Sequence, residues 1–436
     1  MRSFVQRRLV LLLAVLVIAV ASAGSWGATP VQAAGPTEGP VFNDPTGTDE
    51  QQMAIMNKIL AAISGTKRGA TIRMAMFSFT IQAFADRLIS AHKRGVRVRL
   101  ILDDHETFPA WERMEKELGT NPRASSFAVK CHGACLTENE PSYMHTKIYM
   151  FSETSGVPLV VMVSSANPTY FQARRGWNNG YTIVRDATMY DAFKRNFETM
   201  AIGARNPNQP TTSPNAYFTA TSGKHKVYFF PKSGTGADDD PMYGILQNIR
   251  CTGLASGYGS AGRTTIRIAM YQWSILRVRL AERIWSLDDQ GCKVTIMFDP
   301  TRVDPGVLRA LIKPGGRHGG PAIVPAATDE DENGVVDKMV HDKYMLVDGS
   351  YAGDTSARVV FTGSANWTNN ALHYNDEFML RIWDGTVFSA FLKHWDKVRT
   401  FARASIGTGT DLRDATDRLR SYPRPVRLEF IERNGI

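Results

Sequence analysis

The apolar and polar positions of this chain follow two different periods in turn. Short apolar runs occur at 71–76 (TIRMAM) and 95–104 (GVRVRLILDD), and between them the apolar residues of 81–89 recur at helical spacing. The same order returns at 265–270 (TIRIAM), 275–285 and 291–300 (GCKVTIMFDP). Alternating strands and helices of this kind predict an α/β fold in which helices flank a central sheet.

Four segments of the first half of the chain recur in the same order in the second half. Besides the two pairs of strands, MHTKIYMF at 144–151 matches VHDKYMLV at 340–347, and SSANPT at 164–169 matches GSANWT at 363–368. The offset is 194 residues from Thr71 to Thr265 and 199 residues from Asn167 to Asn366. An offset that drifts so little indicates that one α/β domain was duplicated, with small loop insertions.

The repeat predicts how the chain divides into domains. We expect a first domain over 41–205 and a second over 223–436, each opened by a helix, near 49–64 and 241–250. The segment 206–222 is rich in Asn, Pro, Thr and Ser and lacks apolar periodicity, so it is the predicted linker. A chain of 436 residues is longer than one core usually holds, which agrees with two domains.

The first 33 residues have the pattern of a signal peptide. Arg2, Arg7 and Arg8 lead into an uncharged apolar run at 9–23, and small-residue cleavage patterns end at Ala23 and Ala33. The apolar run is shorter than the roughly 20 residues that cross a bilayer. We therefore expect residues 1–33 to be cleaved and the product to be secreted and extracellular.

The net charge of the chain only partly restricts the classes of binding partner. The formal net charge is +9 at pH 7, and the predicted signal peptide carries three of the positive charges. The rest of the chain is therefore mildly basic, which suits an anionic phospholipid surface or a nucleic acid without distinguishing between them.

Four cysteines bear on the redox compartment. They are Cys131, Cys135, Cys251 and Cys292, and an even number in an exported chain favours disulfides. Cys131 and Cys135 are close enough to close a small loop, in which case Cys251 pairs with Cys292. Sequence alone nevertheless allows three connectivities.

A His-x-Lys pair occurs at corresponding points of the two copies, each time followed by Ser-x-Asn. The second copy is complete, with His341, Lys343 and Asp348, then Gly-Ser-x-Asn at 363–366, then Glu377. It resembles the HxKxxxxD…GSxN signature of the phospholipase D superfamily, and the resemblance covers nearly all of the chain beyond the predicted signal peptide. Residues two apart on a strand share a face, so the His and Lys of each copy point together.

The resemblance implies two duplicated α/β domains, each a mixed sheet flanked by helices, related by approximate twofold symmetry with the active site between them. One neutral histidine attacks phosphorus and forms a phosphohistidine, while the other protonates the departing alcohol and then activates water or an acceptor alcohol. Lysine and asparagine side chains stabilise the charge on the non-bridging oxygens. The expected catalytic residues are His145, Lys147, Asn167, His341, Lys343, Asn366, Asp348 and Glu377, with Ser165 and Ser364 as substrate-binding candidates.

The first copy departs from this pattern at three positions. Ser152 stands where Asp348 stands in the second copy, and Ser164 replaces the glycine of Gly-Ser-x-Asn. Gly180 aligns with Glu377, with two asparagines just before it. We interpret these departures as divided labour between the half-sites, and the alternative is a first half-site that has decayed.

The asymmetry also predicts roles for the two histidines. A carboxylate beside a histidine raises its pKa, so Glu377 should make its partner the better proton donor, and we expect that partner to be His341. His145, with only amide partners, would stay neutral and act as the nucleophile. Asp348 either takes part in catalysis or is a buried structural acid.

One acidic loop matches part of a calcium-binding motif. Asp329, Asp331, Asn333 and Asp337 occupy positions within its first nine residues, but position twelve is Val340 instead of a bidentate glutamate. A solvated loop is therefore the favoured interpretation, and calcium binding is the alternative. We expect no cofactor, because the two lysines supply fixed positive charge.

The sequence therefore predicts a secreted phosphoric diester hydrolase. Phospholipase D activity, by hydrolysis or by transfer to an alcohol, is the first hypothesis. An extracellular nuclease or other phosphodiesterase on the same scaffold and a non-catalytic binding or toxin module are the alternatives. The expected partner is a phospholipid, with peripheral membrane contact, or another phosphodiester such as nucleic acid. A monomer suffices, because one chain carries both half-sites.

Overall fold

The computed structural model describes residues 35–105, 107–137, 141–204, 216–234, 239–330 and 336–406. The predicted signal peptide and residues 206–215 of the predicted linker lie outside these ranges. All described residues fall within one compact unit. In these ranges, no helix is both long enough and apolar enough to cross a membrane.

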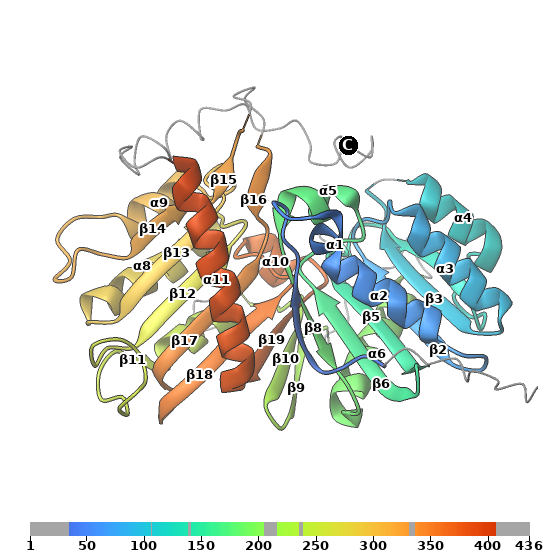
Figure 1. The fold of residues 1–436 in the computed structure, drawn as a ribbon, viewed down its shortest axis with the longest axis horizontal. Coiled ribbons are helices and arrows are strands. Elements are labelled where there is room, and N and C mark those ends of the chain that lie inside the picture. Colours follow the sequence, from blue (N-terminus) through green and yellow to red (C-terminus); the bar gives the residue numbers. More distant parts are fainter. Residues whose placement is uncertain are drawn as a thin grey trace, which may run out of the picture. The chain divides into compact units, whose positions relative to one another are not determined.

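The first half of the chain forms a mixed sheet flanked by helices, as expected (Figure 1). Its strands are β1 (Gly39–Phe42), β2 (Thr71–Met76), β3 (Arg97–Asp103), β4 (Phe127–Cys131), β5 (Lys147–Thr154), β6 (Val157–Ser164) and β8 (Asn179–Ile183). Their order is β1-β8-β6-β5-β2-β3-β4, in which β2, β3 and β4 are parallel and the other pairs are antiparallel. The helices are α1 (Asp49–Gln52), α2 (Ala54–Gly65), α3 (Gln82–Lys93), α4 (Pro109–Leu118), α5 (Tyr170–Arg175) and α6 (Ala187–Gly203).

The second half repeats this plan. Its strands are β9 (Phe218–Ser222), β10 (His225–Phe230), β11 (Ile249–Arg250), β12 (Thr265–Met270), β13 (Lys293–Phe298), β14 (Ala322–Pro325), β17 (Lys343–Tyr351), β18 (Asp354–Gly363) and β19 (Glu377–Trp383). The order is β14-β13-β12-β17-β18-β19-β10-β9, with β11 paired to β17. Read from β10 to β14, it repeats the order of the first sheet strand for strand, as a duplicated domain requires.

Helices of the second half take the places of those in the first. They are α7 (Pro241–Gln247), η2 (Ile275–Arg277), α8 (Val278–Asp289), α9 (Pro305–Leu311), α10 (Asn369–His373) and α11 (Gly385–Ile406). A small third sheet joins β15 (Ala327–Thr328), β16 (Lys338–Val340) and β7 (Gly176–Trp177), and β16 and β7 come from different halves.

One part of the predicted linker is wrong. Residues 218–222 form β9, which pairs antiparallel with β10 at the edge of the second sheet. The polar and Thr-rich composition of β9 fits an edge strand, since its residues are alternately half-buried and exposed. The domain limits themselves stay predictions.

Alternate residues of the central strands enter different cores. Tyr149 and Phe151 of β5 pack with α2, α3 and α4 on one face of the first sheet, whereas Ile148 and Met150 point to the other face. That second face belongs to a core that also contains Tyr344 of β17 and residues of α6 and α11. The two halves therefore share one hydrophobic core. The remaining face of the second sheet packs with α7, α8 and α9.

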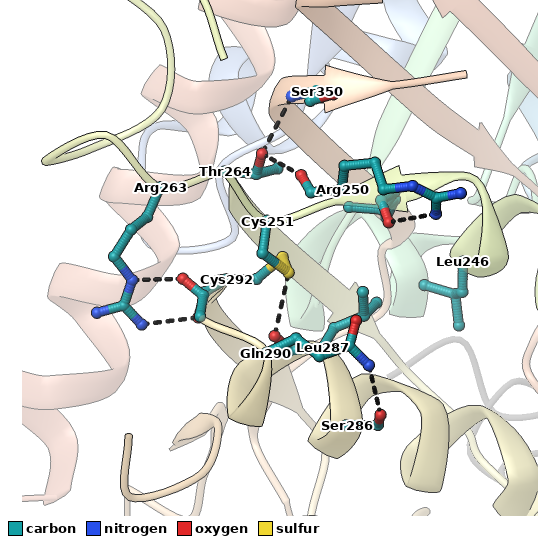
Figure 2. The surroundings of a disulfide bond; sticks show 12 residues. Leu246, Arg250, Cys251, Arg263, Thr264, Ser286, Leu287, Gln290, Cys292 and Ser350 are labelled. Carbon is teal, nitrogen blue, oxygen red and sulfur yellow. Dashed lines mark hydrogen bonds between the residues drawn. A yellow bond between two sulfur atoms is a disulfide. The ribbon is translucent and has the colours of Figure 1, made fainter. Parts of the chain in front are cut away.

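Both expected disulfides are confirmed. Cys131 pairs with Cys135, and Cys251 pairs with Cys292 across 41 residues of sequence. Figure 2 shows the second bond, which joins the end of β11 to the residue that precedes β13. Thr264 reinforces this corner, because its Oγ1 donates to the carbonyl of Arg250 at 2.6 Å and accepts from the amide of Ser350 at 3.0 Å.

Candidate active site

The two His-x-Lys pairs lie at the starts of equivalent strands. β5 begins at Lys147 and β17 begins at Lys343, and each histidine lies two residues earlier. The histidine backbones are held by the opposite half of the chain: the amide of His145 donates to the carbonyl of Asp376 at 3.1 Å, and that of His341 donates to the carbonyl of Trp177 at 3.0 Å. Each half thus holds the backbone of the other half's histidine in place.

Each imidazole is also bonded to a side chain of the opposite half. Nδ1 of His145 lies 2.7 Å from Oε1 of Glu377, and Nδ1 of His341 lies 2.8 Å from Oδ1 of Asn178. The amide of Asn178 is oriented by its own donors, because its Nδ2 donates to the carbonyls of Gln172 and Gly176, each at 3.0 Å. Both imidazoles therefore donate from Nδ1 and present Nε2 to the site.

This arrangement corrects two expectations. Glu377 is bonded to His145 and not to His341 as predicted. The strand register identifies its counterpart in the first half. Ser164 of β6 pairs with Gly180, and the equivalent Gly363 of β18 pairs with Met379, so Gly180 corresponds to Met379. Two residues earlier in each half, Asn178 therefore corresponds to Glu377. An alignment within one half cannot reveal a partner that comes from the other half.

The two lysines are buried and placed alike. Nζ of Lys147 donates to the carbonyl of His145 at 2.5 Å, and Nζ of Lys343 donates to the carbonyl of His341 at 2.6 Å. Nζ of Lys343 also lies 3.0 Å from Nδ1 and 3.1 Å from Nε2 of His341, which places the lysine nitrogen against this imidazole ring.

Burial and crowding of like charges control the ionisation of these groups. Burial lowers the pKa of His145 to about 4, although the charge of Glu377 acts in the opposite direction. Burial, followed by Lys343 and Lys147, lowers the pKa of His341 well below its usual range. The pKa of Lys343 is likewise held well below its usual range by burial and by Lys147. A buried anion would relieve all three shifts, since an opposite charge favours the protonated forms.

Asn167 and Asn366 occupy equivalent buried positions. Oδ1 of Asn167 accepts from the amide of Ser78 at 3.3 Å, while its buried Nδ2 has no hydrogen-bond partner among the described residues. The carbonyl of Asn366 accepts from Arg277 at 3.3 Å, which ties this asparagine to η2. A buried donor such as Nδ2 of Asn167 is suited to a phosphate oxygen.

Ser165 and Ser364 are fully buried and support the chain around the site. Oγ of Ser165 donates to Oδ1 of Asn178 at 2.9 Å and accepts from the amide of Asn179, and Oγ of Ser364 accepts from the amide of Phe378 at 3.1 Å. These bonds hold the junction of β7 and β8, which carries Asn178, and the start of β19, which carries Glu377. Contact of either serine with substrate stays a prediction.

Asp348 is half-buried and paired with an arginine, and its part in catalysis stays a prediction. It lies on β17 five residues beyond Lys343 and is bonded to Nε of Arg358 on β18 at 3.3 Å. At strand spacing, five residues span about 16 Å, so Asp348 lies far from the presented imidazoles. Ser152 takes the equivalent place in β5, where its Oγ accepts from the amide of Thr71 at 2.9 Å.

The predicted calcium loop lies partly outside the described residues. Asp331 and Asn333 fall in that gap, while Asp337 accepts from the amide of Glu330 at 2.9 Å and lies 4.0 Å from Arg175. The described residues contain no group of three or more His, Cys, Asp or Glu placed to hold a metal ion.

Sequence reasoning missed the residue between His341 and Lys343. Asp342 is fully buried, accepts from Nδ2 of Asn179 at 2.6 Å and lies 2.8 Å from Nε2 of His394 on α11. This network anchors the second His-x-Lys to the first half and to the last helix. No sequence signal distinguishes His394, because its partner lies 52 residues away.

An aromatic ring beside each pair was also missed. Phe77 follows β2 and lies 5.2 Å from the ring of His145, and Tyr271 follows β12 and lies 4.5 Å from that of His341. Both directly follow the repeated TIRMAM and TIRIAM strands, so the repeat itself could have identified them.

Comparisons with known proteins agree with the fold and the motifs. The family model described as the phospholipase D-like domain of cardiolipin synthase matches residues 59–201 and again residues 259–399. The sequence search against curated proteins finds no match.

Solved structures with a similar fold have low sequence identity. Phosphatidylserine synthase of Haemophilus influenzae Rd KW20 is 12% identical, with a TM-score of 0.54 over 88% of this chain and 94% of that chain. Polyphosphate kinase of Porphyromonas gingivalis is also 12% identical, with a TM-score of 0.51 over 88% of this chain and only 55% of that longer chain. The two family matches together span well over half of the sequence, and the chain therefore belongs to the phospholipase D-like family, whose superfamily consists of enzymes that process phosphodiester bonds.

Proposed function

We propose that this protein cleaves the head-group phosphodiester of phospholipids, and transfers the phosphatidyl group to water or an alcohol, through a phosphohistidine on His145. The observation that carries the proposal is the crossed pairing, in which His145 has a carboxylate partner and His341 has an amide partner. Each half supplies what the other lacks, so the four His and Lys residues form one composite site.

The crossed pairing favours His145 as the nucleophile. The carboxylate of Glu377 fixes the hydrogen on Nδ1, leaves the lone pair on Nε2 and stabilises the positive charge that the imidazole gains on attacking phosphorus. The nucleophile is thus the one predicted from sequence, but for the opposite reason. His341 has only the neutral Asn178 oxygen beside it, so its imidazolium is the stronger acid and the better proton donor.

The reaction takes two steps in this scheme. Nε2 of His145 forms a bond to phosphorus, and the bond from phosphorus to the head-group oxygen breaks. His341, which the bound phosphate anion favours as an imidazolium with both nitrogens protonated, gives that oxygen the proton from Nε2. Water or an acceptor alcohol then attacks phosphorus, gives its proton to His341 and releases His145. The two ammonium groups and Nδ2 of Asn167 meet the charge on the non-bridging oxygens.

An exposed apolar turn beside the site favours a lipid over a nucleic acid. Leu276 is 73% exposed and Ile275 is 42% exposed, and both lie in η2. Arg277 of the same turn donates to the carbonyl of Asn366 and is paired with Asp240 at 2.7 Å, which fixes the turn next to the site. Two adjacent exposed aliphatic side chains suit insertion among lipid chains and offer no stacking surface for bases.

Export is part of the proposal. Both disulfides support it, since such bonds persist mainly in oxidising compartments.

The first experiment uses full-length mature protein, His145→Ala and His341→Ala, in excess chelator. We expect wild type to form phosphatidylethanol from phosphatidylcholine vesicles with added ethanol, and both variants to lose about 1,000-fold or more of this activity. Cleavage of single-stranded DNA without action on the vesicles would replace the phospholipid by a nucleic acid. Wild-type activity in His145→Ala would instead favour a non-catalytic first half-site.

A second substrate separates the two histidines. A phosphatidyl ester of p-nitrophenol needs no proton on its leaving group, so His341→Ala should still release a burst of about one equivalent of p-nitrophenol and retain the phosphatidyl group on the protein. His145→Ala should give no burst. Labelled phosphate on His341 of the wild-type protein would reverse the assignment.

The exposed turn is tested with Ile275→Ser/Leu276→Ser. We expect weaker binding to phosphatidylcholine vesicles and a lower rate on them, with the rate on a short-chain monomeric phospholipid retained. The matched control is Ile202→Ser, which changes an aliphatic residue that is 49% exposed on α6. Equal loss on monomers and vesicles would contradict a docking role.

A further inference from the structure

The site continues beyond His341 into an aromatic ring and a further cation. The ring of Tyr271 lies near three charged or titratable groups. Its centroid is 4.5 Å from the centroid of the His341 ring, 4.9 Å from Nζ of Lys343 and 5.8 Å from the guanidinium carbon of Arg302. Arg302 itself is half-buried. Its guanidinium therefore lies near the same ring as the catalytic groups, in a residue that is not fully buried.

The backbone at Arg302 is held in place. The amide of Arg302 donates to the carbonyl of Asp299 at 3.0 Å, and its carbonyl accepts from the amide of Trp273 at 3.3 Å. Because Trp273 follows Tyr271 by two residues, the segment that carries the ring and the segment that carries the cation are bonded to each other. The position of Arg302 beside Tyr271 is thus built into the fold.

The positive charge of Arg302 is poorly compensated. No carboxylate of the described residues lies within 4.0 Å of its guanidinium. The charge of Arg302 lowers the pKa of Asp299, but burial has the larger effect and raises this pKa, which opposes ionisation of the carboxyl group. Oδ1 of Asp299 also already accepts from the amide and Oγ1 of Thr301. Arg302 also lowers the pKa of His341, which agrees with its closeness to the imidazole.

The first half is built differently at the equivalent place. There the ring of Phe77 stacks on His105 at 3.8 Å, and Nδ1 of His105 is bonded to Oδ1 of the buried Asp103 at 2.6 Å. The titratable group at this ring therefore has a carboxylate in direct contact, which the guanidinium of Arg302 lacks. Among the described residues, the uncompensated cation thus lies on the side of His341.

The side of the site on which this positive charge lies determines which part of the substrate it can contact. In a phosphoryl-type displacement the attacking atom and the leaving oxygen lie roughly in line on opposite sides of phosphorus. With His145 as the attacking group, the leaving alcohol lies on the side of His341, and an acceptor alcohol enters by the same side in the second step. The groups beyond His341 therefore contact the head group or the acceptor, and not the diacylglycerol part.

We infer that Arg302, which lies beside Tyr271, forms a subsite for a second anionic group, a phosphate or a carboxylate, on the leaving or acceptor alcohol. The inference rests on the proposed function, because it takes its direction from His145 as the nucleophile. A guanidinium suits this role, since its planar donors bind such oxyanions in pairs and its charge does not vary with pH. The subsite makes Arg302 a determinant of which alcohol is used.

The test is a competition between two acceptors that differ by one phosphate. Full-length mature protein is given phosphatidylcholine vesicles together with glycerol and glycerol 3-phosphate, and both transfer products and phosphatidic acid are measured. We expect Arg302→Ala to lower the ratio of transfer to glycerol 3-phosphate over transfer to glycerol by about tenfold or more, because a charge-assisted hydrogen bond is lost. Arg302→Lys should restore part of the ratio.

The outcomes separate the two claims. The matched control is Arg309→Ala, which removes an exposed arginine of α9 and should leave the ratio unchanged. An unchanged ratio in Arg302→Ala, in a protein that still forms phosphatidic acid, overturns the subsite and leaves the proposed function intact. If wild type forms neither phosphatidic acid nor a transfer product, the proposed function itself fails. A ratio taken within one variant is insensitive to partial unfolding, which lowers both products alike.

Discussion

At the scale of single residues, the site depends on which side chain lies behind each imidazole. Glu377 and Asn178 occupy the same place in the two halves, one as a carboxylate and one as an amide, and each is bonded to the histidine of the other half. Glutamate and asparagine differ by one methylene and by a carboxylate oxygen in place of the amide nitrogen. The carboxylate stabilises a neighbouring imidazolium, whereas the neutral amide does not. The proposed division of labour between the half-sites therefore rests on these two positions.

Replacing Glu377 by glutamine tests the role of the charge. Glutamine retains an acceptor for Nδ1 of His145, but the carboxylate that raises the pKa of His145 is lost, so this pKa falls below its value of about 4. A less basic imidazole is a weaker nucleophile, and we expect the rate of phosphoenzyme formation to fall about 100-fold or more. Burst kinetics measure it, with Glu282→Gln on the exposed side of α8 as the control. A normal burst rate in Glu377→Gln would exclude this role.

Replacing Asn178 by aspartate should change the pH profile. A carboxylate beside Nδ1 of His341 favours the imidazolium and raises the pKa of His341 from its depressed value. The proton donor then keeps its proton to higher pH, so the alkaline limb of the profile of kcat should move to higher pH. Loss of the bonds from Nδ2 of Asn178 lowers stability but cannot move this limb, and an unmoved limb would assign proton donation to another group.

At the scale of elements, each disulfide has a different task. The loop of Cys131 and Cys135 lies against the site, because the amide of Cys135 donates to Oδ2 of Asp376 at 2.5 Å and the carbonyl of Asp376 holds the backbone of His145. The end of α6 closes on this loop at Gly203, where a Cβ would lie 1.9 Å from the carbonyl oxygen of Cys135. The bond between Cys251 and Cys292 makes no such link to the site and joins β11 to β13 (Figure 2).

Serine double variants should separate these tasks. Loss of the Cys251–Cys292 bond, which closes 41 residues, should lower the free energy of unfolding by about 4 kcal/mol with little change in kcat of the folded protein. Loss of the Cys131–Cys135 bond should lower it by only about 2 kcal/mol but reduce kcat about tenfold, because Asp376 and His145 lose their support. Denaturant titration and vesicle assays measure both quantities. Equal effects of the two variants on kcat would contradict the distinction.

At the scale of the whole molecule, the two halves are joined by a common core. Phe193 of α6, in the first half, lies 5.0 Å from the ring of Phe229 on β10 and 5.9 Å from that of Phe378 on β19. Phe378 directly follows Glu377, so packing between the halves also positions the carboxylate partner of His145. We therefore expect stability and catalysis to be coupled through this contact.

Phe193→Ala should therefore affect both halves at once. Truncating a fully buried phenylalanine lowers the free energy of unfolding by about 3–5 kcal/mol. We expect tryptophan fluorescence and enzyme activity to be lost in one coincident denaturant transition, shifted to lower concentration. Ile202→Ala, at an exposed position of the same helix, should shift it by less than about 0.5 kcal/mol. Two separate transitions would mean that the halves unfold independently.

The sequence by itself determined the fold class, the duplication and the family, and its even number of cysteines indicated disulfides without fixing which cysteines pair. These properties are local or repeated: strand and helix periods lie within each segment, and TIRMAM and TIRIAM, or the two His-x-Lys pairs, can be compared directly along the chain. The same local logic also marked Asn167 and Asn366. Their catalytic use, like that of the histidines and lysines, stays a prediction.

Only the tertiary structure decided which side chains contact one another at the site. His145 and Glu377 are 232 residues apart, and their contact depends on how two sheets face each other, which no pattern within either half encodes. Asp348 is distant from the site because strand length separates it from Lys343. Arg302 becomes relevant only because the loop after β13 is bonded to the segment after β12. A sequence motif identifies the candidate reacting groups, whereas the packing of two similar halves decides how their surroundings differ.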